Sequence, residues 1–153
     1  MPTERLWVVI KMKENQELLT SILNTAQMGQ TGIRCALKTT MRPTLRKAME
    51  SQLREYDAIE REAHAIAISR GWELRDLEPA AKTMATIVTK AKLSHGNTDS
   101  KLASMMILGN TRGMILGLKE LHQFNKNDPQ VTTLCQKLLD CETANIRQMQ
   151  GFL

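Results

Sequence analysis

Aromatic residues, valine and proline are scarce in this chain of 153 residues. It contains two Trp, one Tyr and two Phe, only four Val against 19 Leu, and four Pro. Strands are enriched in β-branched and aromatic residues, whereas Leu, Ala, Met, Lys and Glu are good helix formers. The composition therefore predicts an all-α domain and argues against a β-sandwich or a β-barrel.

Long apolar runs are also absent. The longest uncharged run near Met105 ends at Arg112, short of the roughly 18 apolar residues that suggest a membrane span. Residues 6–10 (LWVVI) are too few for the apolar core of a secretory signal. Three Cys, an odd number without a Cys-x-x-Cys pair, are typical of a reducing compartment. The sequence thus predicts a cytoplasmic protein without a membrane partner.

The predicted domain organisation has two parts. Residues 1–13 are a leader of uncertain structure, and residues 14–153 form one domain.

Positive charge is modest and spread along the chain. The net charge is +5, from 21 basic and 16 acidic residues. The nearest approach to a basic cluster has no aromatic residue within it and consists of Arg34, Lys38, Arg42, Arg46 and Lys47. Nucleic-acid interfaces usually combine clustered basic residues with aromatic or groove-reading neighbours. We therefore expect no nucleic-acid partner.

Apolar residues recur every three or four positions in four long segments, as in amphipathic helices. The segments cover about residues 14–39, 43–70, 98–124 and 129–150, and a shorter helical stretch follows Pro79. Pro43 and Pro129 suit first helical turns, Asp128 suits an N-cap and Gly71 suits a helix end. The segment between residues 71 and 97 is long enough to cross the length of a bundle. The prediction is a four-helix bundle of two antiparallel hairpins, joined by a long crossover that contains a short extra helix.

The second predicted helix carries short motifs of a known family. They are Pro43-Thr44-Leu45-Arg46, then Glu55-Tyr56 and Ile59, then Arg70-Gly71-Trp72. This stretch resembles the spore-coat F family, a branch of the ferritin-like superfamily that also includes rubrerythrins. The resemblance covers residues 15–75 by motif and the rest by layout, and Glu73 departs from the Tyr that tends to follow the Trp there. It implies a ferritin-like bundle with a structural role, in the cytoplasm or associated with a spore.

Ferritin-like proteins that bind two metal ions use a Glu on each of two helices and a Glu-x-x-His on each of the other two. No Glu-x-x-His occurs in this chain. Amides stand where the first and third long helices should offer Glu, and neutral amides cannot balance two divalent cations. We therefore expect no metal, no cofactor and no catalytic residues. The alternative is a divergent iron or manganese oxidoreductase or storage protein built on Glu60, Glu62, His64 and Glu142.

Polar residues at helix-stripe positions predict a buried polar layer instead of the metal site. Buried polar groups must find hydrogen-bond partners, and these side chains could satisfy one another: Gln27, Gln30, Gln52, Asn110, Glu142 and Asn145. A buried Glu142 would need Arg112, a proton or water to offset its charge.

Three glycines four residues apart, at Gly109, Gly113 and Gly117, form a flat strip on the third long helix. Each lowers helix propensity by about 1 kcal/mol relative to Ala, so close packing should offset them. Met105 and Met106 lie in the same segment, and we expect a homodimer contact there. The leading hypothesis is a non-catalytic bundle with a structural or protein-interaction role. A binding module for a small apolar ligand is a further alternative.

Overall fold

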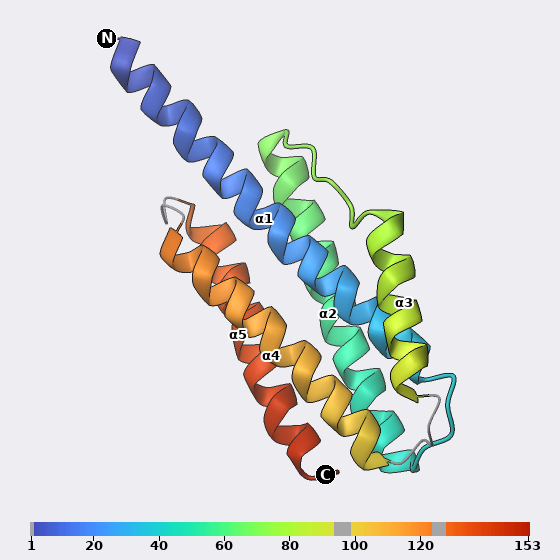
Figure 1. Ribbon diagram of the computed structural model, residues 1–153. Helices are drawn as coiled ribbons and strands as arrows, with labels where there is room; N and C mark the ends of the chain where they lie inside the picture. The colour runs from blue at the N-terminus through green and yellow to red at the C-terminus, as the bar shows by residue number, and fades with distance from the viewer. Residues whose placement is uncertain (1, 94–98, 124–127) are drawn as a thin grey trace.

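The computed structural model describes residues 2–93, 99–123 and 128–153. These residues form α1 (Pro2–Ala36), α2 (Pro43–Arg70), α3 (Pro79–Leu93), α4 (Asp99–Gln123) and α5 (Pro129–Gln150), and they contain no strand. Figure 1 shows α1, α2, α4 and α5 as a bundle of antiparallel neighbours, with α3 against the outside of α1. The predicted all-α bundle of two hairpins and a long crossover with an extra helix is confirmed.

One apolar core fills the space between the four long helices. Its residues recur at helical spacing, so each helix turns one face inward. Burial of each large apolar side chain contributes about 1.5–3 kcal/mol. The largest fully buried side chains are Leu18, Leu19, Ile22, Leu23, Ile33, Leu45, Met49, Ile59, Leu102, Leu134, Leu138 and Met149.

Helix ends follow the local signals in the sequence. α2 begins at Pro43, and Gly71 after its last residue has φ +68°, a left-handed conformation that glycine adopts without strain. The Gly71 N–H donates to the carbonyl of Ile68. Asp128 caps α5 by accepting from the N–H groups of Gln130 and Val131. These boundaries agree with the predicted ones.

α1 is longer than the sequence predicts, because the helix begins at Pro2 and not near residue 14. Its 35 residues correspond to about 52 Å of helix, and its N-terminal part extends beyond the other helices in Figure 1. Pro2 fits a first turn, and no Gly or further Pro interrupts the next residues. Leu6, Trp7, Val8 and Val9 are 56–62% exposed. We call residues 3–10 the α1 projection.

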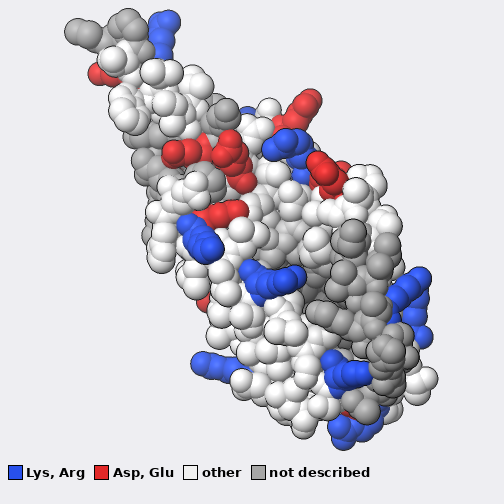
Figure 2. All heavy atoms as spheres, in the orientation of Figure 1, with Lys and Arg blue, Asp and Glu red and all other residues white. Residues whose placement is uncertain are grey.

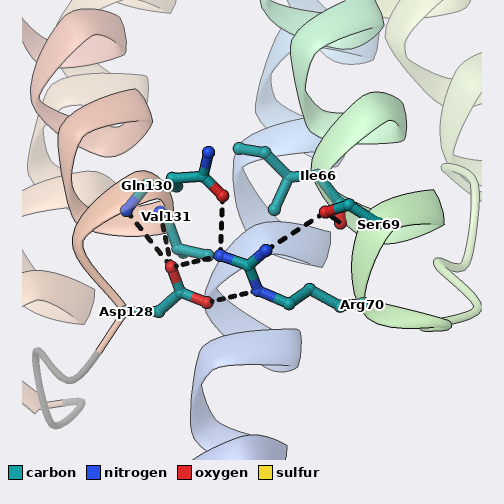
Figure 3. Close-up of polar contacts among 6 residues, drawn as sticks. All are labelled: Ile66, Ser69, Arg70, Asp128, Gln130 and Val131. Atoms are coloured by element: carbon teal, nitrogen blue, oxygen red, sulfur yellow. Dashed lines mark hydrogen bonds and ion pairs between the residues drawn. The ribbon is translucent and has the colours of Figure 1, made fainter.

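An ion pair joins the ends of α2 and α5 (Figure 3). Arg70 Nε donates to Asp128 Oδ2 and Arg70 Nη2 to Asp128 Oδ1, both at 3.0 Å. The same carboxylate accepts from the Gln130 N–H at 3.1 Å. Hydrogen bonding to Arg70 is the main reason that the pKa of Asp128 is lowered. One carboxylate therefore both caps α5 and connects the two hairpins.

Asp128→Ala should lower the free energy of unfolding by about 1–2 kcal/mol, because it removes the N-cap of α5. Asp128→Asn should lose less, since the amide oxygen still caps the helix while the ion pair with Arg70 is gone. Urea unfolding of both variants measures the difference. Equal losses would show that the cap contributes nothing beyond the ion pair.

No helix in the described residues has the length and apolar character needed to cross a membrane.

Candidate functional site

The Tyr56 hydroxyl lies in the interior of the bundle, between three helices. From α2 it contacts Asn110 Oδ1 on α4 at 3.0 Å and Glu142 Oε1 on α5 at 2.8 Å. The three side chains are buried, and we call them the central polar cluster. Two glycines make room for them: a Cβ on Gly29 would lie 2.5 Å from Tyr56 Cε2, and one on Gly113 would lie 2.9 Å from Glu142 Oε1.

The arrangement favours a protonated Glu142. Burial is the main cause that raises its pKa to about 8, and the nearby charge of Glu55 acts in the same direction. The Tyr56 hydroxyl has one proton but contacts two oxygen atoms. A neutral Glu142 resolves this, because its own O–H can donate to Tyr56 while Tyr56 donates to Asn110. The cluster is then a chain of hydrogen bonds between neutral groups.

Several polar atoms near this cluster have no hydrogen-bond partner among the described residues. They are Asn110 Nδ2, Glu142 Oε2 and both amide atoms of Gln52, which lies one turn before Tyr56 on α2. Gln52 is fully buried. The predicted mutual network of buried polar groups therefore forms only between Asn110 and Glu142, and it runs through Tyr56. Tyr56 was missing from the predicted layer, although its place on the apolar stripe of α2 marked it as buried.

The other three amides of the predicted layer are buried but bond to groups outside the cluster. Gln27 Nε2 donates to Asp76 Oδ1 at 2.9 Å, and Gln27 Oε1 accepts from the Leu77 N–H at 2.7 Å. Gln27 thus attaches the crossover to α1.

Gln30 Nε2 donates to Asp57 Oδ1 at 2.9 Å, and Asn145 Nδ2 donates to Glu55 Oε2 at 3.2 Å. Gln27, Gln30 and Asn145 therefore do not join the mutual network that the sequence predicts among the buried polar residues. Their amide N–H groups donate to carboxylates at the edge of the bundle instead, because carboxylates are stronger hydrogen-bond acceptors than neutral groups.

The residues of the alternative metal site are not brought together. Glu62 Oε2 accepts from Lys137 Nζ at 3.0 Å on the surface, whereas Glu142 points inward to Tyr56. Glu60 and His64 are half-buried on α2. In the part of the chain that the structure describes, no group of three or more His, Cys, Asp or Glu side chains is placed to hold a metal ion.

The three cysteines are free thiols. Burial raises the pKa of Cys135 and of Cys141 to about 11, which keeps both protonated and poorly nucleophilic at neutral pH.

The predicted glycine face of α4 is mostly internal. A Cβ on Gly117 would lie 2.9 Å from Leu139 Cδ2 of α5, and Gly113 faces Glu142. Met106 is buried too, and Met105 is partly buried. Gly113, Gly117 and Met106 therefore pack within the chain and are not available for the predicted dimer contact. Gly109 is the exception, since a Cβ there would meet no atom within 4 Å.

Arginines near the turn between α1 and α2 form ion pairs and hydrogen bonds with other residues of the chain. Arg34 pairs with Asp57, and Arg42 pairs with Asp99 at the start of α4. Arg46 donates to the carbonyl groups of Leu37 and Thr39. These contacts stabilise one end of the bundle and occupy three of the five side chains in the basic segment.

An open hollow on the outer surface of α5, next to Glu55 of α2, is lined by residues that include Gln136, Lys137 and Asp140. It lies on the surface, unlike the apolar space between helices that the ligand-binding alternative requires.

No protein-family model matches the chain, and no curated protein matches it. Among solved structures, the chain is similar to the crystal structure of a DUF305 fragment from Deinococcus radiodurans. The two share 16% sequence identity over 90% of this chain and 93% of that chain, with a TM-score of 0.71. At this identity the similarity concerns the fold, which is a helical bundle of unassigned role.

Proposed function

We propose that the chain is a non-catalytic helical bundle with a structural role, which associates with a second copy through the α1 projection. The observation that carries this proposal is the run of exposed apolar residues from Leu6 to Val9, beyond the end of the bundle. Exposed apolar surface of this kind commonly marks a protein contact. The resemblance of residues 15–75 to the spore-coat F family supports a structural role for a ferritin-like bundle.

The core-facing stripe of α1 continues into the projection. Val8 precedes Leu19 by 11 residues and Ala26 by 18, which are three and five full helical turns, so all three lie on one side of the helix. Leu19 and Ala26 are fully buried, whereas Val8 is exposed. Apolar residues also cover the other sides of this segment, as in helices that are buried all round. A second projection packed against this stripe would extend the apolar core beyond the bundle.

A two-fold dimer would bury both projections at once, because the same surface is supplied by each copy. Trp7 would be the main contact residue, since large aromatic side chains dominate the energetics of interfaces.

The test compares the wild type with the double variant Trp7→Ser/Val8→Ser by sedimentation equilibrium. We expect a dimer whose dissociation constant rises by about tenfold or more in the variant. Ile68→Ser is the matched control, because Ile68 is an apolar residue on α2, outside the α1 projection, that is 81% exposed. The dimer of this variant should equal that of the wild type. A wild type that stays monomeric at about 100 µM, or a control that weakens the dimer equally, would contradict the proposal.

A further inference from the structure

A second apolar surface lies on the outer side of α4, away from the α1 projection. Leu108, Ile115 and Leu116 are 57%, 47% and 44% exposed. Leu108 and Ile115 are seven residues apart, so they lie on one side of the helix, two turns apart. Figure 1 places α1 and α4 on the near side of the bundle.

The neighbouring part of α1 extends this surface. Thr25 Cγ2 lies 3.2 Å from the position of a Gly113 Cβ, and α1 and α4 run antiparallel (Figure 1). Met28, one turn after Thr25, therefore lies beside Gly109, one turn before Gly113. Met28 is 39% exposed, and the open space over Gly109 gives room for a side chain from outside. We call Met28, Leu108, Gly109, Arg112, Ile115 and Leu116 the α4 outer face.

The charge on this surface has one sign. Arg112 lies between Leu108 and Ile115 and is exposed, as is Lys119 two turns further on. Within the described residues, Arg112 and Lys119 form no ion pair. The two acidic residues of α4 face other groups: Asp99 pairs with Arg42, and Glu120 Oε1 accepts from the Ser21 hydroxyl at 2.6 Å. In Figure 2 the acidic side chains gather in the upper part of this view, while much of the rest is uncharged or basic.

A second copy of the chain fits this surface poorly. A two-fold contact centred on the α4 outer face places the middle residue of one copy next to the same residue of the other. That residue is Arg112, so two arginines would meet in an apolar interface. Burying like charges together is unfavourable.

We propose that the α4 outer face binds an amphipathic helix of a partner protein that carries acidic residues beside its apolar stripe. The apolar stripe would pack on Leu108, Ile115 and Met28, with one of its side chains over Gly109. Carboxylates of the partner would pair with Arg112, whose guanidinium can hold a carboxylate with two hydrogen bonds. This binding is independent of the α1 projection.

The probe is a synthetic 21-residue helix with leucines at helical spacing and Glu on both flanks of the leucine stripe. A second peptide carries Lys at every Glu position. Fluorescence anisotropy with the full-length chain should show binding of the acidic peptide, with a dissociation constant at least about tenfold lower than that of the basic peptide. Arg112→Glu should weaken binding of the acidic peptide by about tenfold or more and improve binding of the basic one. Leu108→Ser/Ile115→Ser should weaken binding of both.

Arg54→Glu is the matched control, because Arg54 is an exposed arginine on α2, and it should leave both affinities unchanged. Circular dichroism verifies that all variants are folded. Equal affinity for the two peptides, or an Arg112→Glu variant that binds like the wild type, would overturn the proposal. A wild-type dimer that dissociates on Leu108→Ser/Ile115→Ser would overturn it too, in favour of a second copy on this face.

Discussion

Glu142→Gln should make the protein more stable than the wild type at pH 9, by about 3–5 kcal/mol, and should change little at pH 5. Burial raises the pKa of Glu142 to about 8 in the folded state, against an ordinary value of 4.5. Between these two values the folded state binds more protons than the unfolded state. The wild type therefore loses stability as the pH rises from about 4.5 to about 8. Glutamine stays neutral throughout, and its amide N–H can donate to the Tyr56 hydroxyl as the protonated carboxyl does.

Urea unfolding followed by circular dichroism between pH 5 and pH 9 measures this effect. Glu17→Gln is the control, because Glu17 is exposed on α1, and it should reproduce the pH profile of the wild type. Parallel profiles for the wild type and Glu142→Gln would show that Glu142 is ionised in the folded protein. In that case the Tyr56 hydroxyl would donate to Glu142 instead of accepting from it.

Gly29→Ala should destabilise the protein by about 1–3 kcal/mol, although alanine is the better helix former. A Cβ at this position would lie 2.5 Å from Cε2 and 2.7 Å from Cζ of Tyr56, far inside the usual carbon–carbon distance of about 3.5–4.0 Å. The ring cannot move away freely, because its hydroxyl is held by Asn110 and Glu142. The substitution therefore forces either the ring or α1 to shift.

Gly32→Ala is the matched comparison, three residues further along α1. A Cβ there meets nothing within 4 Å, so we expect a gain of about 0.5–1 kcal/mol from helix propensity. Chemical unfolding of both variants should thus give changes of opposite sign. A gain of stability in both would mean that the Tyr56 ring adapts without loss.

The two ends of α2 and the start of α5 were predictable because short-range chemistry determines them, whereas the start of α1 at Pro2 was not predicted. Pro43, Asp128 and Pro129 each determine a helix start through contacts or backbone angles within one turn. Gly71 follows α2, where the backbone adopts the left-handed conformation. The burial of the polar residues was predictable too, because Gln52, Asn110 and Glu142 lie on apolar helical stripes. Helical periodicity states which side of a helix faces inward, and it does so from the sequence alone.

The partners of the buried polar residues were not predictable in this way. Periodicity does not give the axial position of one helix relative to another, and this offset decides which side chains come into contact. Gln27 bonds to the crossover and Gln30 to Asp57, whereas the sequence made both candidates for the interior layer. The glycines of α4 show the same limit, because Gly113 and Gly109 are one turn apart, yet one faces Glu142 and the other faces open space.

The attachment of the crossover to α1 bears on the order of folding during synthesis. Gln27 binds Asp76 and Leu77, and Gln16 Nε2 donates to the Glu73 carbonyl at 2.9 Å. Both glutamines belong to the first helix, so each of these hydrogen bonds joins residues that leave the ribosome before α4 does. Domains fold from the N-terminus as the chain emerges, and the first hairpin can therefore fix the path of the crossover early. The second hairpin then packs on the open side of a partly assembled bundle, and the crossover has already set the direction in which this hairpin runs.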